Sequence, residues 1–67
     1  MSVAKITEIS SSSSTSFEDA IQNGLQRASK TLKNISGAWV ESQKVDVENG
    51  RITNWRVIMK VTFVLDD

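Results

Sequence analysis

The fold is decided by the stretch AWVESQKVDVENGRITNWRVIMKVTFVL, residues 38–65. At its centre, Asn49 and Gly50 tolerate the positive φ that the two-residue loop of a type I′ hairpin requires. Runs rich in β-branched residues flank this dipeptide over residues 38–47 and 52–65, which is typical of two antiparallel strands. With Asn49 and Gly50 as the loop, Glu48 faces Arg51. The pairing then continues outward in the same register, so that Gln43 faces Arg56.

This register places the side chains of the hairpin on two faces, because successive side chains of a strand point to opposite sides. The expected core face comprises Ala38, Val40, Ser42, Lys44, Asp46, Thr53, Trp55, Val57, Met59, Val61, Phe63 and Leu65. The second face mixes apolar and charged residues and comprises Trp39, Glu41, Gln43, Val45, Val47, Ile52, Asn54, Arg56, Ile58, Lys60, Thr62 and Val64. One helix cannot cover both sides of a three-stranded sheet, so we expect the second face to meet another subunit or a ligand. A β-bulge would shift the alternation and change this assignment.

Upstream of the hairpin, the sequence predicts a further strand and a loop. The β-branched stretch over residues 1–10 is interpreted as the first strand. The hydroxyl-rich residues 10–16 are interpreted as a loop that precedes a helix. Thr15 and Ser16 each have an acidic residue three positions later, which is the spacing of a capping box.

The helix is predicted over residues 17–33. Apolar or small residues recur three or four positions apart and form one stripe, which comprises Phe17, Ala20, Ile21, Gly24, Leu25, Ala28 and Leu32. Acidic residues near its start and Lys30 and Lys33 near its end complement the helix dipole. Gly24 costs about 1 kcal/mol relative to alanine in a helix. It either lets the helix approach the sheet closely or is a tolerated defect.

Together these elements predict one α+β domain over residues 1–67, in the order β-α-β-β, with a three-stranded antiparallel sheet and one helix. A chain of 67 residues builds a small core, which alone rarely contributes more than about 3–5 kcal/mol to stability. The chain has no cysteine for disulfides. We therefore expect it to self-associate.

The composition excludes several classes of function. Without Cys or His, the chain has no thiol nucleophile, no metal site built on these residues and no His-based catalytic triad. Tyr is also absent, and no two carboxylates have a convincing spacing on one element, so we expect no enzyme activity. Eight basic residues balance eight acidic ones, which argues against nucleic acid or an anionic membrane as partner. No secretory signal or membrane span is recognisable, so the expected compartment is the cytoplasm.

Four segments of the chain resemble the dodecin family: TSFEDA at 15–20, RASKTLKN at 27–34, ENG at 48–50 and KVTFVL at 60–65. The resemblance extends over essentially the whole chain without an obvious gap. It implies a β-α-β-β subunit whose sheet is partly wrapped around the helix, with twelve copies closed into a hollow sphere. It also implies binding of a flavin (riboflavin, FMN or FAD) at subunit interfaces, for storage or sequestration without turnover.

The resemblance also suggests where a flavin would bind. The tryptophan that stacks on the flavin ring in flavin-binding dodecins matches Gly37, and the nearest aromatic residue is Trp39. The glutamine that hydrogen-bonds the ring in that family matches Arg56, and a basic residue near the ligand matches Lys44. This divergent branch would use Trp39 as the stacking platform, Gln43 and Arg56 at the ring edge, and Lys44 as a charge partner.

Other interpretations of the same residues remain open. Trp39 is also suited to anchoring a subunit interface without any ligand. The protein would then be a hollow structural shell, or an ion-binding one if carboxylates meet around a symmetry axis; the available acids are Glu41, Asp46, Glu48, Asp66 and Asp67. Within one chain no metal-binding loop is recognisable. A third possibility is a small dimer whose strand edges accept a partner peptide.

Overall fold

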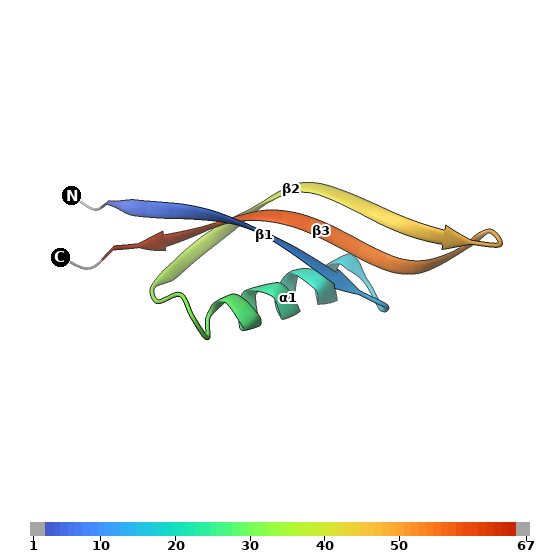
Figure 1. Ribbon diagram of the computed structural model, residues 1–67, viewed down its shortest axis with the longest axis horizontal. Coiled ribbons are helices and arrows are strands. Elements are labelled where there is room, and N and C mark those ends of the chain that lie inside the picture. The colour runs from blue at the N-terminus through green and yellow to red at the C-terminus, as the bar shows by residue number, and fades with distance from the viewer. Residues whose placement is uncertain (1–2, 66–67) are drawn as a thin grey trace.

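The computed structural model describes residues 3–65. It contains, in chain order, β1 (Ala4–Ser13), α1 (Phe17–Ala28), β2 (Ile35–Glu48) and β3 (Arg51–Val64). The strands form one antiparallel sheet in the order β1-β3-β2, and α1 packs on one face of it against β1 and β3 (Figure 1). The predicted α+β class and element order are confirmed. Within the described residues, no helix is both long and apolar enough to cross a membrane.

The β2–β3 hairpin is the longest feature of the molecule. Asn49 and Gly50 have φ values of 52° and 77°, and Glu48 pairs with Arg51, as the type I′ prediction requires. The tip of the hairpin projects past the end of β1 and the start of α1 (Figure 1), and the molecule measures 52 × 19 × 13 Å. The chain is therefore an elongated plate that α1 covers over only part of its length.

The register of the hairpin differs from the prediction in its middle. β2 carries one extra residue, Glu41, between the pairs Val40–Met59 and Ser42–Ile58, and β3 carries one extra residue, Thr53, near the tip. The predicted pairs hold on either side of this segment but are wrong within it. Because a bulge reverses the in-and-out alternation, residues 42–47 of β2 lie on the opposite face from the one predicted for them.

The core lies between α1 and the face of the sheet that we call the helix face. Val57, Met59 and Val61 of β3 are almost completely buried there together with Ala20 of α1. Partly buried hydrophobic residues complete it: Ile9, Phe17, Ile21, Leu25, Ile35 and Val40. The core prediction for β3 is confirmed for Val57, Met59 and Val61, whereas Thr53 and Leu65, also predicted on the core face, are exposed. In β2, the predicted core-face residues Ser42, Lys44 and Asp46 lie on the opposite face instead, because their partners Ile58, Arg56 and Asn54 alternate with the buried residues of β3.

The hydroxyl-rich segment departs from the predicted loop. β1 continues to Ser13, pairing Ser10–Ser13 with residues 55–58 of β3, and only residues 14–16 connect it to the helix. Ser16 is the N-cap, and its hydroxyl accepts a hydrogen bond from the backbone N–H of Asp19 at 3.0 Å. Ser11 of this segment has a packing role that its polarity does not reveal.

That role is to allow the close approach of α1 to the sheet at Gly24. A Cβ at this position would lie 2.9 Å from Ser11 Cβ and 2.9 Å from Met59 Cε. The Ser11 hydroxyl donates to the carbonyl oxygen of Ala20 at 2.7 Å, which fixes the helix on the strand. Of the two roles considered for Gly24, the close approach is the one observed.

The helix is shorter than predicted. It ends at Ala28, and Ser29 forms the C-cap, so Lys30 and Lys33 follow the helix rather than occupying its last turn. The carbonyl of Ala28 accepts the backbone N–H groups of Thr31 and Leu32, which turns the chain away. Asn34, with φ of 62°, then leads into β2.

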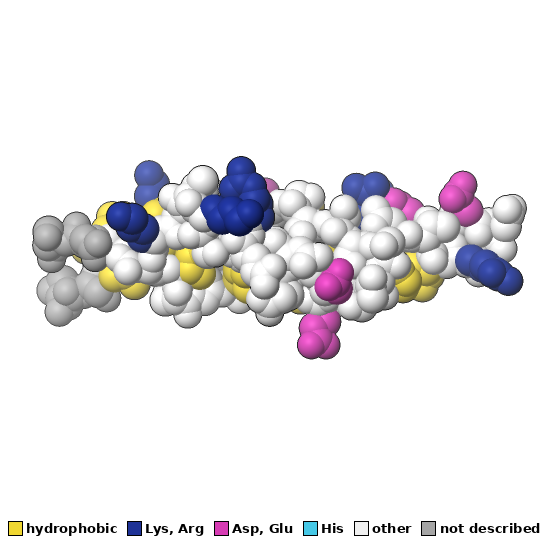
Figure 2. Space-filling view, turned by 90° about the horizontal axis from the view of Figure 1, so that it is seen from below, with side chains coloured by type: hydrophobic (Ala, Val, Ile, Leu, Met, Phe, Trp, Pro, Cys, Tyr) yellow, Lys and Arg dark blue, Asp and Glu magenta, His cyan; other side chains and the backbone are white. Residues whose placement is uncertain are grey.

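Basic and acidic side chains both appear on the side seen in Figure 2, where hydrophobic atoms show only in small separate patches.

Candidate functional site

The candidate site lies on the face of the sheet turned away from α1, which we call the outer face. Its residues are Ile6, Glu8, Ser10 and Ser12 of β1, Arg56, Ile58 and Lys60 of β3, and Trp39, Ser42, Lys44 and Asp46 of β2. No element of the described chain covers this face, since α1 packs on the other one. The prediction that a second face stays uncovered is confirmed, although its membership differs.

Trp39 is the largest exposed apolar side chain of the outer face, with 65% of its surface accessible. It pairs across the hairpin with Lys60, whose Nζ lies over the indole at 5.5 Å from the ring centroid. Glu41 Oε1 lies 3.5 Å from the same Nζ. A cation over an exposed ring contributes about 0.5–1 kcal/mol. Lys60 thus orients the indole while leaving most of its surface accessible.

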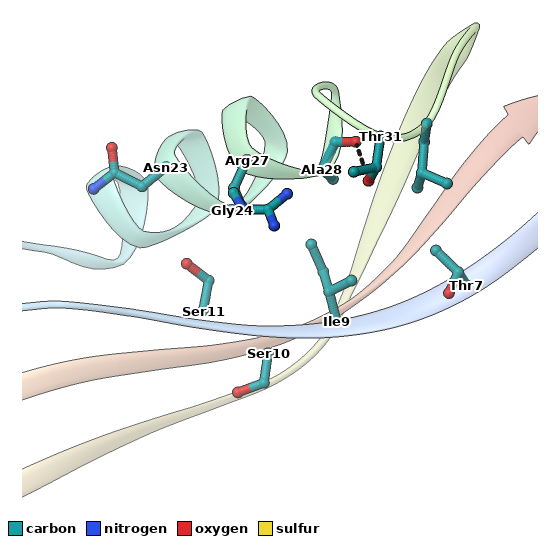
Figure 3. A pocket seen from close by; sticks show the side chains of 10 residues that line it. Thr7, Ile9, Ser10, Ser11, Asn23, Gly24, Arg27, Ala28 and Thr31 are labelled. Atoms are coloured by element: carbon teal, nitrogen blue, oxygen red, sulfur yellow. Dashed lines mark hydrogen bonds between the residues drawn. The ribbon is translucent and has the colours of Figure 1, made fainter.

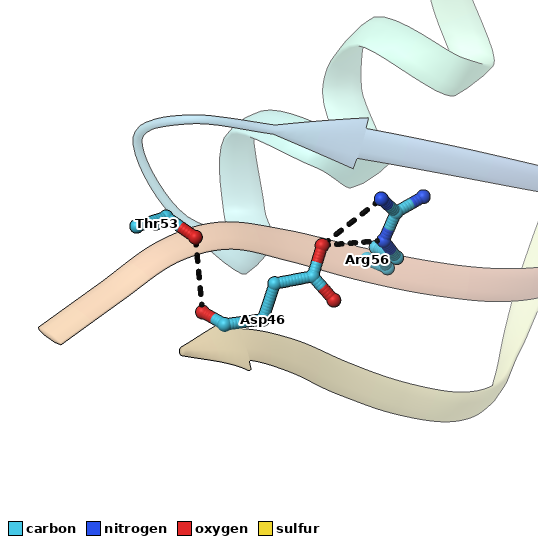
Figure 4. A network of polar contacts seen from close by, with 3 residues as sticks. All are labelled: Asp46, Thr53 and Arg56. Carbon is cyan, nitrogen blue, oxygen red and sulfur yellow. Dashed lines mark hydrogen bonds and ion pairs between the residues drawn. The ribbon is translucent and has the colours of Figure 1, made fainter. Parts of the chain in front are cut away.

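A charged cluster lies further along the same face toward the hairpin tip. Arg56 donates from Nε and Nη2 to Asp46 Oδ2, at 3.0 and 2.9 Å (Figure 4). The hydrogen bond from Arg56 lowers the pKa of Asp46 below its ordinary value of 3.8, with smaller contributions from the charges of Arg56 and Lys44. Asp46 is therefore an ionised anchor for the guanidinium. Lys44 pairs with Arg56 across the hairpin, and no carboxylate of the described residues forms a salt bridge with it.

A small hollow of about 160 Å³ lies beside this cluster, lined by Ser10, Ser42, Lys44, Arg56 and Ile58. The rung formed by Ser42 and Ile58 separates Trp39 and Lys60 from Lys44 and Arg56. Lys60 lies four residue steps from Arg56 along β3, which corresponds to about 13 Å along the face. The exposed aromatic ring and the two basic groups thus lie on one face, and their separation is comparable to the length of a medium-sized cofactor.

The structure brings together three of the four predicted site residues. Trp39 and Arg56 lie on the outer face as expected, and Lys44 joins them there although it was predicted on the core face. Gln43 pairs with the buried Val57 and therefore lies on the helix face, so its predicted pairing with Arg56 is wrong. The single cause of both changes is the extra residue Glu41 in β2.

Other residues of the site were not singled out by sequence. Ser10 is predicted where the first strand ends and the loop begins, and Ser42 is predicted on the core face. Lys60 was already opposite Trp39 in the predicted register, which was the signal for their contact. Gly37, which matches the stacking tryptophan of flavin-binding dodecins, pairs with Thr62, and a Cβ there would meet nothing within 4 Å. Space for a ring beside Trp39 is therefore available in the chain.

Comparison with known proteins places this geometry in a family. The Dodecin family model matches residues 3–66. The chain is 36% identical to a dodecin from Streptomyces davaonensis, with a TM-score of 0.92 over 98% of this chain and 97% of that one. It is 27% identical to a dodecin from Streptomyces coelicolor, with a TM-score of 0.91 over 98% and 94% of the two chains.

A third similar structure comes from another genus. The chain is 28% identical to an arginine-to-alanine mutant of the Thermus thermophilus dodecin, with a TM-score of 0.93 and complete coverage of both chains. No curated protein matches the sequence significantly. The family model and these structures agree over nearly the full length of the chain, and from them we conclude that it belongs to the dodecin family.

Proposed function

We propose that the chain is a subunit of a homododecamer that binds a flavin against the outer face and stores or sequesters it. Dodecin family proteins are non-enzymatic flavin-binding proteins. The observation that carries the proposal is the exposed indole of Trp39 on a sheet face that the chain itself leaves uncovered. In an assembly, that face would be closed by a second subunit, and a planar ring would be held between the two.

The residues present fit such a ligand in two respects. Stacking of a planar heterocycle on an aromatic side chain contributes about 1–3 kcal/mol, and Trp39 offers the ring for it. Lys44 adds positive charge about 13 Å away, which suits the phosphate of FMN or FAD, whereas the charge of Arg56 is balanced by Asp46. We propose Trp39 as the stacking residue, Lys44 as the charge partner and Arg56 as a hydrogen-bond donor held in place by Asp46. Gln43 is left out of the site because it lies on the helix face.

The proposal is tested by titrating the purified protein with riboflavin and with FMN while recording flavin fluorescence. Saturable quenching at micromolar flavin is expected for the natural protein, and Trp39→Ala is expected to abolish it. Lys44→Gln should weaken FMN binding by about tenfold and leave riboflavin binding unchanged, because only FMN carries a phosphate. Lys33→Gln, which changes a lysine away from the outer face, serves as the matched control. Absence of saturable quenching with either flavin would refute the proposal.

A structural shell without an organic ligand is the second candidate function. It is favoured by the contact of Lys60 with Trp39 and Glu41, which gives the indole polar neighbours already in the free chain. In such a shell Trp39 would be an interface anchor. Gel filtration of Trp39→Ala distinguishes the two functions. Loss of the large assembly favours the shell, whereas an intact assembly that no longer quenches flavin favours the cofactor site.

A further inference from the structure

A hollow larger than the one beside Lys44 and Arg56 lies on the helix side of the sheet. It has a volume of about 480 Å³ and opens between β1 and the C-terminal half of α1 (Figure 3). Its lining residues are Thr7, Ile9, Ser10, Ser11, Asn23, Gly24, Arg27, Ala28, Thr31 and Leu32. Pockets of about 300–1,000 Å³ are the size that binds small organic molecules.

The shape of this hollow follows from how α1 is attached to the sheet. The contact between Gly24 and Ser11 holds the middle of the helix close to β1. Beyond it the two elements diverge (Figure 1), and the chain after Ala28 turns back through Thr31 and Leu32 to form an end wall. The walls are thus a helix, a strand and a hydrogen-bonded turn, all of which are regular or fixed backbone.

The lining combines one positive charge with an apolar floor. Arg27 lies on the helix side of the hollow, and the Ile9 side chain rises from β1 opposite it (Figure 3). Within residues 3–65, no carboxylate forms a salt bridge with Arg27. Ala28 and Leu32 supply further apolar surface, and Thr7 supplies a hydroxyl. This arrangement suits a molecule with an apolar body and one anionic group.

The charge of the ligand can be narrowed further. A guanidinium binds a carboxylate through two parallel hydrogen bonds. The hollow lies beside the C-terminal end of α1, where the negative end of the helix dipole disfavours anions, and it disfavours a doubly charged group such as phosphate more than a singly charged carboxylate. Arg27 is the one basic residue of the lining. A single negative charge is therefore the best match.

We propose that this hollow is a second ligand site, which binds a small organic carboxylate with an apolar body. Arg27 pairs with the carboxylate, and Ile9, Ala28 and Leu32 contact the apolar part. The hollow and Trp39 lie on opposite sides of the sheet, because Thr7, Ile9 and Ser11 face α1, and Ser10 is the residue that lines both this hollow and the small one of the outer face. Both sites can be occupied in the same subunit.

The test uses the purified protein in its native assembly, with 4-phenylbutyrate as the probe and its neutral amide as the comparison. Binding is measured by saturation-transfer NMR and by titration calorimetry. The carboxylate is expected to bind saturably at millimolar concentration, and the amide about tenfold more weakly or worse. Arg27→Gln should weaken carboxylate binding by a similar factor, while Lys30→Gln, which changes a lysine outside the hollow, should not.

Three results would overturn the proposal. The first is a lack of saturable binding, which is expected if a neighbouring subunit fills the hollow. The second is equal binding of the carboxylate and the amide, and the third is unchanged carboxylate binding in a folded Arg27→Gln variant. The comparison of the two probes on the natural protein decides the question even when Arg27→Gln does not fold. Trp39→Ala should leave phenylbutyrate binding intact, and Arg27→Gln should leave flavin quenching intact. Failure of one site is thereby distinguished from failure of the other.

Discussion

Replacement of Gly24 by alanine sets two effects of known sign against each other. Alanine favours a helix over glycine by about 1 kcal/mol, so propensity alone predicts stabilisation. The new Cβ, however, would lie 2.9 Å from Met59 Cε and 2.9 Å from Ser11 Cβ. Met59 can move the end of its side chain, but Ser11 Cβ is attached to a paired strand and moves only with the backbone. Overpacking of this kind costs about 1–3 kcal/mol, and we take the upper half of that range.

The net expectation for Gly24→Ala is a loss of about 1–2 kcal/mol, which lowers the melting temperature by roughly 4–16 °C for a domain of this size. The assay is thermal unfolding followed by circular dichroism at one fixed protein concentration, because association makes the melting temperature depend on concentration. Gly37→Ala is the matched control, since a Cβ there meets nothing within 4 Å. It should be neutral or stabilising.

A double-mutant cycle identifies the colliding atoms. In a Ser11→Gly background, Gly24→Ala should be less destabilising by about 1 kcal/mol, because the contact with Ser11 Cβ is gone. A rise in melting temperature for Gly24→Ala in the natural background would refute the close-packing argument. It would show that helix propensity outweighs the contact.

Two further predictions concern the helix start and the charged cluster. Ser16→Ala removes the N-cap hydrogen bond to Asp19 and should cost about 1 kcal/mol in chemical denaturation, whereas Ser16→Asp should retain most of the stability. Arg56 lowers the pKa of Asp46 in the folded protein. The ion pair therefore stabilises the fold at any pH above 3.8, the ordinary pKa of Asp, and this stabilisation is lost as the pH falls through the lower pKa of the folded state. The melting temperature of Asp46→Asn should accordingly lie below that of the natural protein at neutral pH and converge with it in acid; a gap independent of pH would contradict this.

Local signals in the sequence were sufficient for most of the fold. The turn at Asn49 and Gly50 and the stripe of α1 depend on neighbouring residues. The turn was predicted correctly, and so was the stripe as far as Ala28, where the helix ends before Leu32. The end of β1 depends instead on a distant partner. Ser10–Ser13 have little strand preference of their own, but they pair with residues 55–58, and a small side chain is needed at Ser11, which lies under Gly24. Tertiary packing therefore overrode the local tendency of serine to end a strand.

The candidate site was predictable in part for the same reason. Trp39 and Lys60 lie on the side of the Glu41 bulge where the predicted register holds. Pairing residues outward from the turn therefore places them opposite each other, as observed. The exchange of Gln43 for Lys44 on the outer face does not follow, because nothing in the local sequence marks Glu41 as an extra residue. The hollow beside Arg27 depends on the angle between α1 and β1, which no spacing in the sequence encodes.

The extra residues Glu41 and Thr53 lie on opposite strands of the same hairpin and act like two compensating frameshifts. Glu41 shifts the register of β2 against β3 by one residue, and Thr53 restores the original register before the turn. Loss of either residue alone would leave the strands one residue out of phase at Asn49 and Gly50, so that the tight loop could no longer close on its proper pair. A homologue that lacks one of these residues must therefore also lack the other or have a different turn. The two positions are thus coupled although they are not in contact.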